Sequence, residues 1–170
     1  MRYRSRVLLL ALACLTALAA GAGETAAQPA KGTGGILTVS CRDAVGREPN
    51  GVQRRVILGV VSVPPRFMPQ IVRYRHDGWA YWSKWGLSIQ AGNRPVLISV
   101  PQAWRKRVAI EWGLGGPVSE QRFEACSPPP THWNAFAGGF SLKAPACVPL
   151  LIQVGGQSRI VRFGVGRRCR

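Results

Sequence analysis

The stretch GWAYWSKWG at positions 78–86 holds three tryptophans and one tyrosine, side chains that can stack on a ligand or fill a core. Extended backbone places successive side chains on opposite faces, so the spacing separates these two roles. Most of the aromatic side chains then share one face, with Ser83 as its only polar member, which indicates a core. Trp82 falls on the other face beside Lys84, and these two residues are candidates for ligand binding. The predicted core face carries Trp79, Tyr81, Trp85, Leu87 and Ile89.

A second candidate is the basic and aromatic stretch PQAWRKR at positions 101–107. Trp104 can stack on a ligand, while the cations that follow it can contact phosphate, sulfate or carboxylate groups. The alternative interpretation is a loop whose tryptophan covers the core and whose charges stay in solvent. The candidate cations are Arg105, Lys106 and Arg107.

Residues suited to acid–base or metal chemistry are few. His76 and Asp77 are neighbours in the sequence, but neighbours on a strand point to opposite faces, so we predict no general-base pair. His132 follows three prolines and a threonine, which predicts a solvated loop residue. Two isolated histidines do not make a metal site. We therefore expect neither a metal nor a cofactor.

Templates for hydrolysis are also incomplete. A serine nucleophile of the hydrolase type needs a GxSxG elbow, and the sequence lacks one. A glycosidase needs two facing carboxyl groups, but Glu111 and Glu124 are predicted to form surface ion pairs with nearby arginines. No glycine-rich phosphate loop, RNA-binding signature or zinc finger is present, so no specific nucleic acid partner is expected. We predict that the protein is not an enzyme, with a hydrolase as the less favoured alternative.

The chain begins in the manner of an exported protein. MRYRSR supplies three arginines and an apolar run over 7–20 follows, as in a secretory signal peptide. Cleavage before Gly23 or before Gln28 fits the small residues there, and the second is preferred. The run is shorter than the roughly 20 residues of a spanning helix, and Cys14 within it matches a lipoprotein site poorly. We predict a signal peptide over 1–27, a flexible linker over 28–34, and a secreted or envelope-associated single domain over 35–170 without a transmembrane segment.

The chain is strongly basic. Its 170 residues include 23 lysines and arginines against 7 acidic residues, a formal net charge of +16. Three of these arginines and one glutamate belong to the predicted signal peptide, so residues 28–170 keep 20 basic and 6 acidic side chains and a net charge of +14. Such a charge favours contact with anionic surfaces or polymers. The cations are spread along the chain, however, and a general bias toward arginine produces the same composition.

Four cysteines follow the predicted signal peptide. An even number in an exported chain predicts two disulfides, for which three pairings are possible. No two of them lie two to four residues apart, as zinc ligands usually do. Cys126 and Cys147 enclose a loop, whereas Cys41 and Cys169 lie near the two ends of the domain. We therefore favour the pairing of 126 with 147 and of 41 with 169.

Short β-rich runs separated by turns make up most of the domain, and no segment of a dozen residues keeps a helical period. In 106–113 and 158–166, apolar residues alternate with polar ones, which is the pattern of antiparallel strands with one buried face. Gly155 and Gly156 suit a tight hairpin turn. We predict an all-β, antiparallel β-sandwich, immunoglobulin-like or related, with eight or nine strands. The runs are 35–41, 54–65, 80–90, 94–101, 106–113, 121–126, 139–144, 147–156 and 158–166.

Five stretches carry a family resemblance: YWSKWGL (81–87), SVPQAWRKRVAIEWG (99–113), WNAFAGGF (133–140), ACVPLLIQVGG (146–156) and VRFGVGRRC (161–169). In these stretches, which cover most of 56–169, the chain resembles a group of small secreted proteins of high-GC Gram-positive bacteria that have no assigned function. The resemblance implies an extracellular β domain with paired cysteines. It implies no catalytic residues.

Together these patterns predict a protein that binds anionic or carbohydrate polymers at the cell envelope. Stacking on Trp82 and Trp104 and ionic contacts from Lys84 and 105–107 are the expected means. The alternative is a structural or protein-interaction module of the envelope. In that case Trp104 is buried against a partner protein, and binding depends little on salt.

Overall fold

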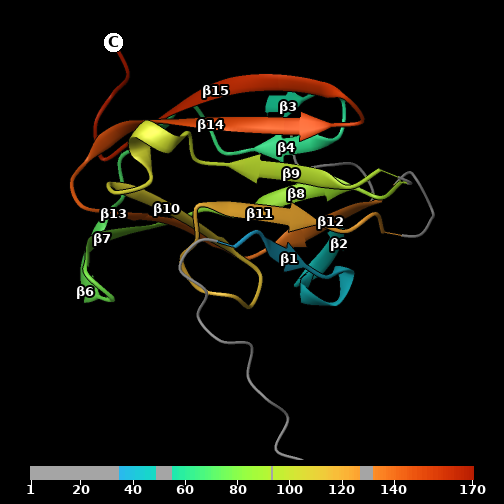
Figure 1. Ribbon diagram of the computed structural model, residues 1–170, viewed down its shortest axis with the longest axis horizontal. Helices are drawn as coiled ribbons and strands as arrows, with labels where there is room; N and C mark the ends of the chain where they lie inside the picture. Colours follow the sequence, from blue (N-terminus) through green and yellow to red (C-terminus); the bar gives the residue numbers. More distant parts are fainter. Residues whose placement is uncertain (1–34, 49–54, 93, 127–131) are drawn as a thin grey trace, which may run out of the picture. The chain divides into compact units, whose positions relative to one another are not determined.

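The computed structural model describes residues 35–48, 55–92, 94–126 and 132–170, which lie within one compact unit of the chain, 32–170. They form strands and two short 3-10 turns, η1 (Cys41–Asp43) and η2 (Gln102–Trp104) (Figure 1). The fold is all-β, sandwich-like and braced by two disulfides, as predicted. The predicted signal peptide and linker lie outside the described residues.

The strands form three sheets. The six-stranded sheet has the order β1 (Leu37–Val39), β11 (Glu120–Phe123), β9 (Val96–Ser99), β14 (Ala146–Val154), β15 (Gln157–Val165) and β5 (Phe67–Met68). The four-stranded sheet has the order β10 (Val108–Trp112), β13 (Gly138–Leu142), β7 (Trp79–Lys84) and β6 (Val72–His76). The five-stranded sheet has the order β2 (Gly46–Glu48), β12 (Trp133–Phe136), β8 (Leu87–Gln90), β4 (Val61–Val63) and β3 (Arg55–Ile57). Pairing is antiparallel except at the edges of the six-stranded sheet, where β1 runs parallel to β11 and β5 runs parallel to β15.

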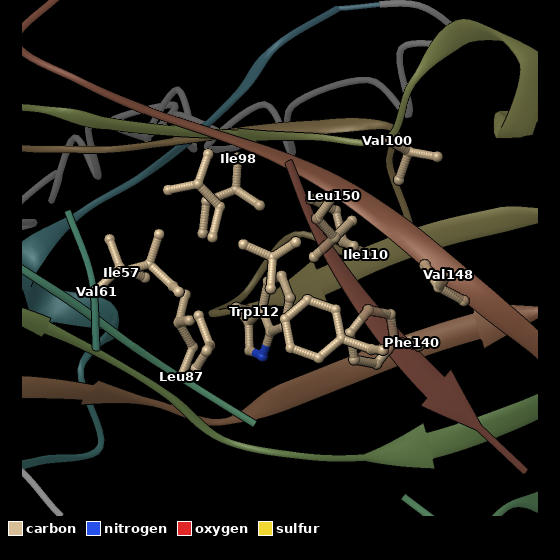
Figure 2. Packing of buried hydrophobic residues seen from close by; sticks show 14 of the residues in the cluster. Ile57, Val61, Leu87, Ile98, Val100, Ile110, Trp112, Phe140, Val148 and Leu150 are labelled. Atoms are coloured by element: carbon tan, nitrogen blue, oxygen red, sulfur yellow. The ribbon is translucent and has the colours of Figure 1, made fainter. Parts of the chain in front are cut away.

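A single hydrophobic core joins the three sheets. Figure 2 shows Ile98 and Leu150 of the six-stranded sheet in one cluster with Leu87 of the five-stranded sheet and Phe140 of the four-stranded sheet. Each of these side chains is at most 2% exposed. The six-stranded sheet is therefore one layer of the sandwich, and the two smaller sheets together form the other layer.

The second layer bends where the chain crosses twice from one small sheet to the other. β7 continues through Trp85 and Gly86 into β8, and β12 continues through Ala137 into β13. The two crossings are adjacent, because the N–H of Trp85 donates to the carbonyl of Gly138 over 2.8 Å. Gly138 has a φ of 147°, and a Cβ there would lie 1.8 Å from the carbonyl oxygen of Glu111. Only glycine fits that position.

Trp112, the last residue of β10, fastens the bend to the core. Its indole N–H donates to the carbonyl of Trp85 over 2.8 Å, and its side chain is almost fully buried. The backbone N–H and carbonyl of Trp112 bond to the side-chain amide of Gln121, on β11 of the opposite layer, at 3.0 and 2.7 Å. Gln121 is fully buried. Hydrogen bonds thus join the two layers in addition to apolar contact.

The observed strands are shorter and more numerous than the eight or nine predicted. The run 54–65 divides at a turn in which Leu58 and Gly59 have φ values of 49° and 74°, and the run 80–90 divides at the bend. The prediction lacks β2, β5, β6 and β12. All five residues of β6 are exposed, so no buried face gives this strand an apolar alternation that a sequence could show.

The predicted local features of the longer strands are confirmed. β14 and β15 form a hairpin of two nine-residue strands, and Gly155 and Gly156 turn it with φ values of 52° and 85°. On β10 and β15 the alternate apolar residues are buried as expected. Most of the predicted aromatic core face packs inward, since Ser83 is buried and Tyr81 and Trp85 contact the core cluster. Trp79 is the exception, because it is half-buried outside that cluster and its ring lies 5.2 Å from the ammonium group of Lys143.

The predicted disulfide pairing is wrong, although all four cysteines are bonded. Cys41 bonds to Cys126 and Cys147 bonds to Cys169. β1 and β11 run parallel, so the cysteines that follow them emerge at the same end of the sheet. The segment between Cys126 and Cys147 contains β12 and β13 of the other layer, so it is a crossing between layers rather than a loop that a disulfide closes.

The pairing has a direct test. Digestion of the unreduced protein should give peptides that link 41 with 126 and 147 with 169. The double substitution Cys41→Ser and Cys126→Ser opens a loop of 85 residues, and the chain-entropy model gives a loss of about 4.6 kcal/mol in the free energy of unfolding. A peptide that links 126 with 147 would contradict the structure.

The buried amide of Gln121 is predicted to be among the costliest polar side chains to remove. Gln121→Ala leaves two buried backbone groups of Trp112 without partners, and each such group costs about 1–3 kcal/mol. We expect urea unfolding to show a loss of about 2–6 kcal/mol. Gln157→Ala, at the exposed first residue of β15, is the control and should change stability by less than about 0.5 kcal/mol. Equal effects of the two substitutions would contradict this role.

Candidate functional site

A basic pocket of about 470 Å³ lies where the η2 turn, the connection from β13 to β14, and the segment after β15 meet. In Figure 1, η2, drawn in yellow, lies beside the end of β15. Six of the eleven lining residues are cations, and none is acidic. The lining consists of Trp104, Arg107, Lys143, Ala144, Pro145, Ala146, Cys147, Arg162, Arg167, Arg168 and Arg170.

The η2 turn supplies an aromatic support for one of the pocket's cations. The guanidinium carbon of Arg107 lies 4.2 Å from the centre of the Trp104 ring, within the range of a cation–π contact. Arg107 also donates from Nη2 to the carbonyl of Ala103 over 3.2 Å. Trp104 itself is half-buried and packs against the hydrophobic core. The ring therefore holds Arg107 in place, and it is less open to stacking on a ligand than the sequence predicts.

Lys143, at the end of β13, forms another wall of the pocket. Its ammonium group donates to the carbonyl of Gly78 in the turn between β6 and β7, and it lies 5.2 Å from the centre of the Trp79 ring. The backbone N–H of Lys143 donates to the carbonyl of Arg107 over 3.0 Å. The pairing of β13 with β10 thus continues past the ends of both strands and holds these two cations side by side.

The segment after β15 brings three more arginines to the pocket. The chain turns at Gly166, which has a φ of 63° and donates its N–H to the carbonyl of Met68. The disulfide between Cys147 and Cys169 then ties this segment to the beginning of β14. Arg168 lies over the ring of Phe67 at 4.4 Å. The covalent link explains how Arg167, Arg168 and Arg170 come to line one pocket.

The pocket contains only two of the six predicted binding residues, Trp104 and Arg107. Arg105 forms an ion pair with Glu120 and donates from Nε to the carbonyl of Val100 over 3.1 Å. Lys106 is exposed and is not among the lining residues. Sequence reasoning missed the cations Lys143, Arg162, Arg167, Arg168 and Arg170. The sequence GRRCR at positions 166–170 indicates a second basic cluster. The predicted pairing of Cys169 with Cys41 directs that cluster away from Trp104, whereas the observed bond to Cys147 brings it to the pocket.

Trp82 and Lys84 lie on the outer face of the four-stranded sheet. Strand register places Trp82 opposite Ser141, and Lys84 opposite Gly139 in the same sheet. Both lie on the face opposite the buried side chains of Ile110 and Phe140, as the alternation predicts. Lys84 is exposed, whereas Trp82 is half-buried.

Glu111 shares this outer face, and its predicted surface ion pair with an arginine is not what the structure shows. Its carboxylate accepts hydrogen bonds from the hydroxyl of Ser141, over 3.0 Å, and from the side chain of Trp82. Burial raises the pKa of Glu111 above its usual value of 4.5, although these two bonds and the nearby His76 act in the opposite direction. Removal from water is thus the dominant effect on this carboxyl group.

The histidine prediction also needs correction. His76 Nδ1 lies 3.1 Å from the carboxylate oxygen Oδ2 of Asp77, because Asp77 has left the strand and has a φ of 48°. Alternation along a strand therefore does not separate the two side chains. Both are exposed, outside the basic pocket and outside a second pocket of about 300 Å³ near Leu58 and Val154. His132, predicted to be solvated, is half-buried.

Other kinds of site have no support within the part of the chain that the structure describes. There, no three histidine, cysteine, aspartate or glutamate side chains gather to hold a metal ion. None of the helices in those same residues has the length and apolarity to cross a membrane. Comparison with models of protein families, with curated proteins and with solved structures finds no match to this chain.

The raised pKa of Glu111 predicts a specific pH dependence. The folded state binds this proton more tightly than the unfolded chain, so stability is lost as the pH rises from 4.5 through the raised pKa. Glu111→Gln removes the buried charge and keeps an acceptor, so at pH 7.5 the variant should be at least as stable as the wild type. Urea unfolding at pH 7.5 and pH 4.5 should show this advantage shrinking at the lower pH. A difference that is the same at both values would refute the assignment.

Proposed function

We propose that this protein is exported and binds anionic polymers at the cell envelope through the basic pocket. The observation that carries this proposal is a concave site lined by five arginines and one lysine, with no acidic side chain among the lining residues. Like charges at such short range repel one another, and an anion that enters the pocket relieves that repulsion.

The preponderance of arginine favours oxyanions as the bound groups. A guanidinium is planar and presents its N–H groups as a fork that matches carboxylate, sulfate or phosphate. Arg107 is held in place by Trp104 and Ala103, so it loses little side-chain freedom on binding. The pocket volume of about 470 Å³ accommodates one charged group together with part of the unit that carries it.

Export is supported by the leader sequence and by the paired cysteines. The sequence at positions 1–27 has the charge and apolar run of a signal peptide. The two disulfides are stable in oxidising compartments and rare in the reducing cytosol. The protein-interaction alternative is less favoured, because Trp104 packs against the core of its own chain and Arg107 lies over its ring.

Charge reversal in the pocket tests this function. The double variant Arg162→Glu and Arg167→Glu should lower the affinity for heparin, used here as a soluble anionic polymer, by tenfold or more. The control is Arg73→Glu with Arg122→Glu, which makes the same change in net charge at exposed positions outside the pocket. The affinity of the control for heparin should fall by less than about threefold, because its charges do not contact a ligand in the pocket. A tenfold loss of affinity corresponds to about 1.4 kcal/mol.

Calorimetric titrations at low and high salt complete the test. Binding through exposed charges should weaken as salt rises, because the screening length is about 8 Å at physiological ionic strength. Equal losses in the two double variants would show that overall charge, rather than the pocket, is responsible. Binding that salt does not change would contradict the proposal altogether.

A further inference from the structure

The indole of Trp82 lies along the outer face of the four-stranded sheet. Trp82 is on β7 and its hydrogen-bond acceptor, Glu111, is on β10, while β13 lies between these two strands. Neighbouring strands are about 4.8 Å apart, and the Glu111 carboxylate already leans over β13, where Ser141 donates to it, so the side chain of Trp82 must lean toward β13 to reach that carboxylate. It cannot do so while standing perpendicular to the sheet.

Small residues on β13 make room for the ring. Gly139 has no side chain, and a Cβ there would lie 1.9 Å from the carbonyl oxygen of Ser83. Ser141, directly opposite Trp82, is fully buried although its side chain is on the outer face. The indole therefore leans over this part of the sheet. Because Trp82 is only half-buried, part of its ring remains accessible to solvent.

Polar side chains beside this ring can form further hydrogen bonds. An ionised carboxylate has about four acceptor sites, and Glu111 uses two of them for Ser141 and Trp82. Lys84 is exposed on the same face, in the register row that contains Gly139 and Glu111. A flat apolar surface with an acceptor and a donor beside it suits a sugar ring, whose C–H groups pack on the indole while its hydroxyls bond at the edge.

The same outer face leads directly to the basic pocket. Ala109, Ser141 and Trp82 form one register row. Arg107 and Lys143 lie two residues from that row, just past the ends of β10 and β13, and the hydrogen bond between their backbones continues the pairing, which places them on the same face. Two residues of extended chain span about 6.8 Å. Both Arg107 and Lys143 line the pocket. One ligand can therefore contact the indole and the pocket together.

We propose that the ligand is an anionic glycan, with a sugar ring stacked on Trp82 and its charged substituent in the basic pocket. This inference rests on the proposed function of the pocket and names the class of polymer that it takes. Trp82 supplies stacking, Glu111 and Lys84 supply hydrogen bonds to hydroxyl groups, and Arg107 and Lys143 begin the anion site.

Two ligands separate the platform from the pocket. A heparin-derived hexasaccharide carries sugar rings and charge, whereas inorganic tripolyphosphate carries charge alone. In calorimetric titrations of the full-length protein, Trp82→Ala should weaken hexasaccharide binding by about tenfold and leave tripolyphosphate binding within twofold. Trp82→Phe keeps an aromatic ring and should retain most of the hexasaccharide affinity. Arg162→Glu with Arg167→Glu should weaken both ligands.

Each result has a definite meaning. If Trp82→Ala leaves hexasaccharide binding unchanged, or weakens both ligands equally, the glycan platform is refuted while anion binding by the pocket stands. If the wild type binds neither ligand, the proposed function fails and this inference fails with it. Binding of tripolyphosphate to the Trp82→Ala sample also shows that the variant is folded, so loss of hexasaccharide affinity in that sample is not a folding defect.

Discussion

The bend in the second layer determines where the candidate binding side chains lie. At the bend, Gly138 lies so close to the backbone of Glu111 that no side chain can be added, and the indole of Trp112 bonds to the carbonyl of Trp85. β13 therefore leaves the five-stranded sheet and pairs with β10 and β7 in a sheet of its own. The register of that small sheet aligns Trp82 with Ser141 and places Lys143 at the pocket. A straight β12–β13 strand would direct these side chains elsewhere.

The disulfide between Cys147 and Cys169 has a comparable role at the other side of the pocket. The arginines after β15 follow each other closely, and repulsion between them and from Arg162 opposes their gathering in one place. No acidic side chain among the lining residues balances these charges. A covalent bond from the beginning of β14 holds the segment despite that repulsion, which ion pairs at the surface, worth at most about 1 kcal/mol each, would not do.

The sequence predicts local features well where one face of a strand is buried. The alternation in β10 and β15 and the Gly155–Gly156 turn appear in the structure because periodicity and positive φ are properties of a few neighbouring residues. Long-range features are harder. The cysteine pairing depends on β1 lying parallel to β11, and the division of 80–90 depends on a contact with Gly138. Neither partner is evident from the segment itself, so the sequence predicts only Arg107 among the six cations that line the pocket.

The contrast between local and long-range features also applies to Trp82 and Trp104. The alternation of side chains along the strand correctly places Trp82 on the outer face. It gives no information on how the ring is oriented relative to the sheet, because that orientation depends on Gly139 and Glu111 on other strands. Trp104 lies outside any strand, and the core fixes its position. Consequently Trp82, which lies within a regular strand, is not packed against the core cluster, whereas Trp104, which lies beside three cations, packs against the core and supports Arg107. Composition identifies which side chains are chemically able to bind a ligand, and the register of neighbouring strands decides which of them lie on a common surface.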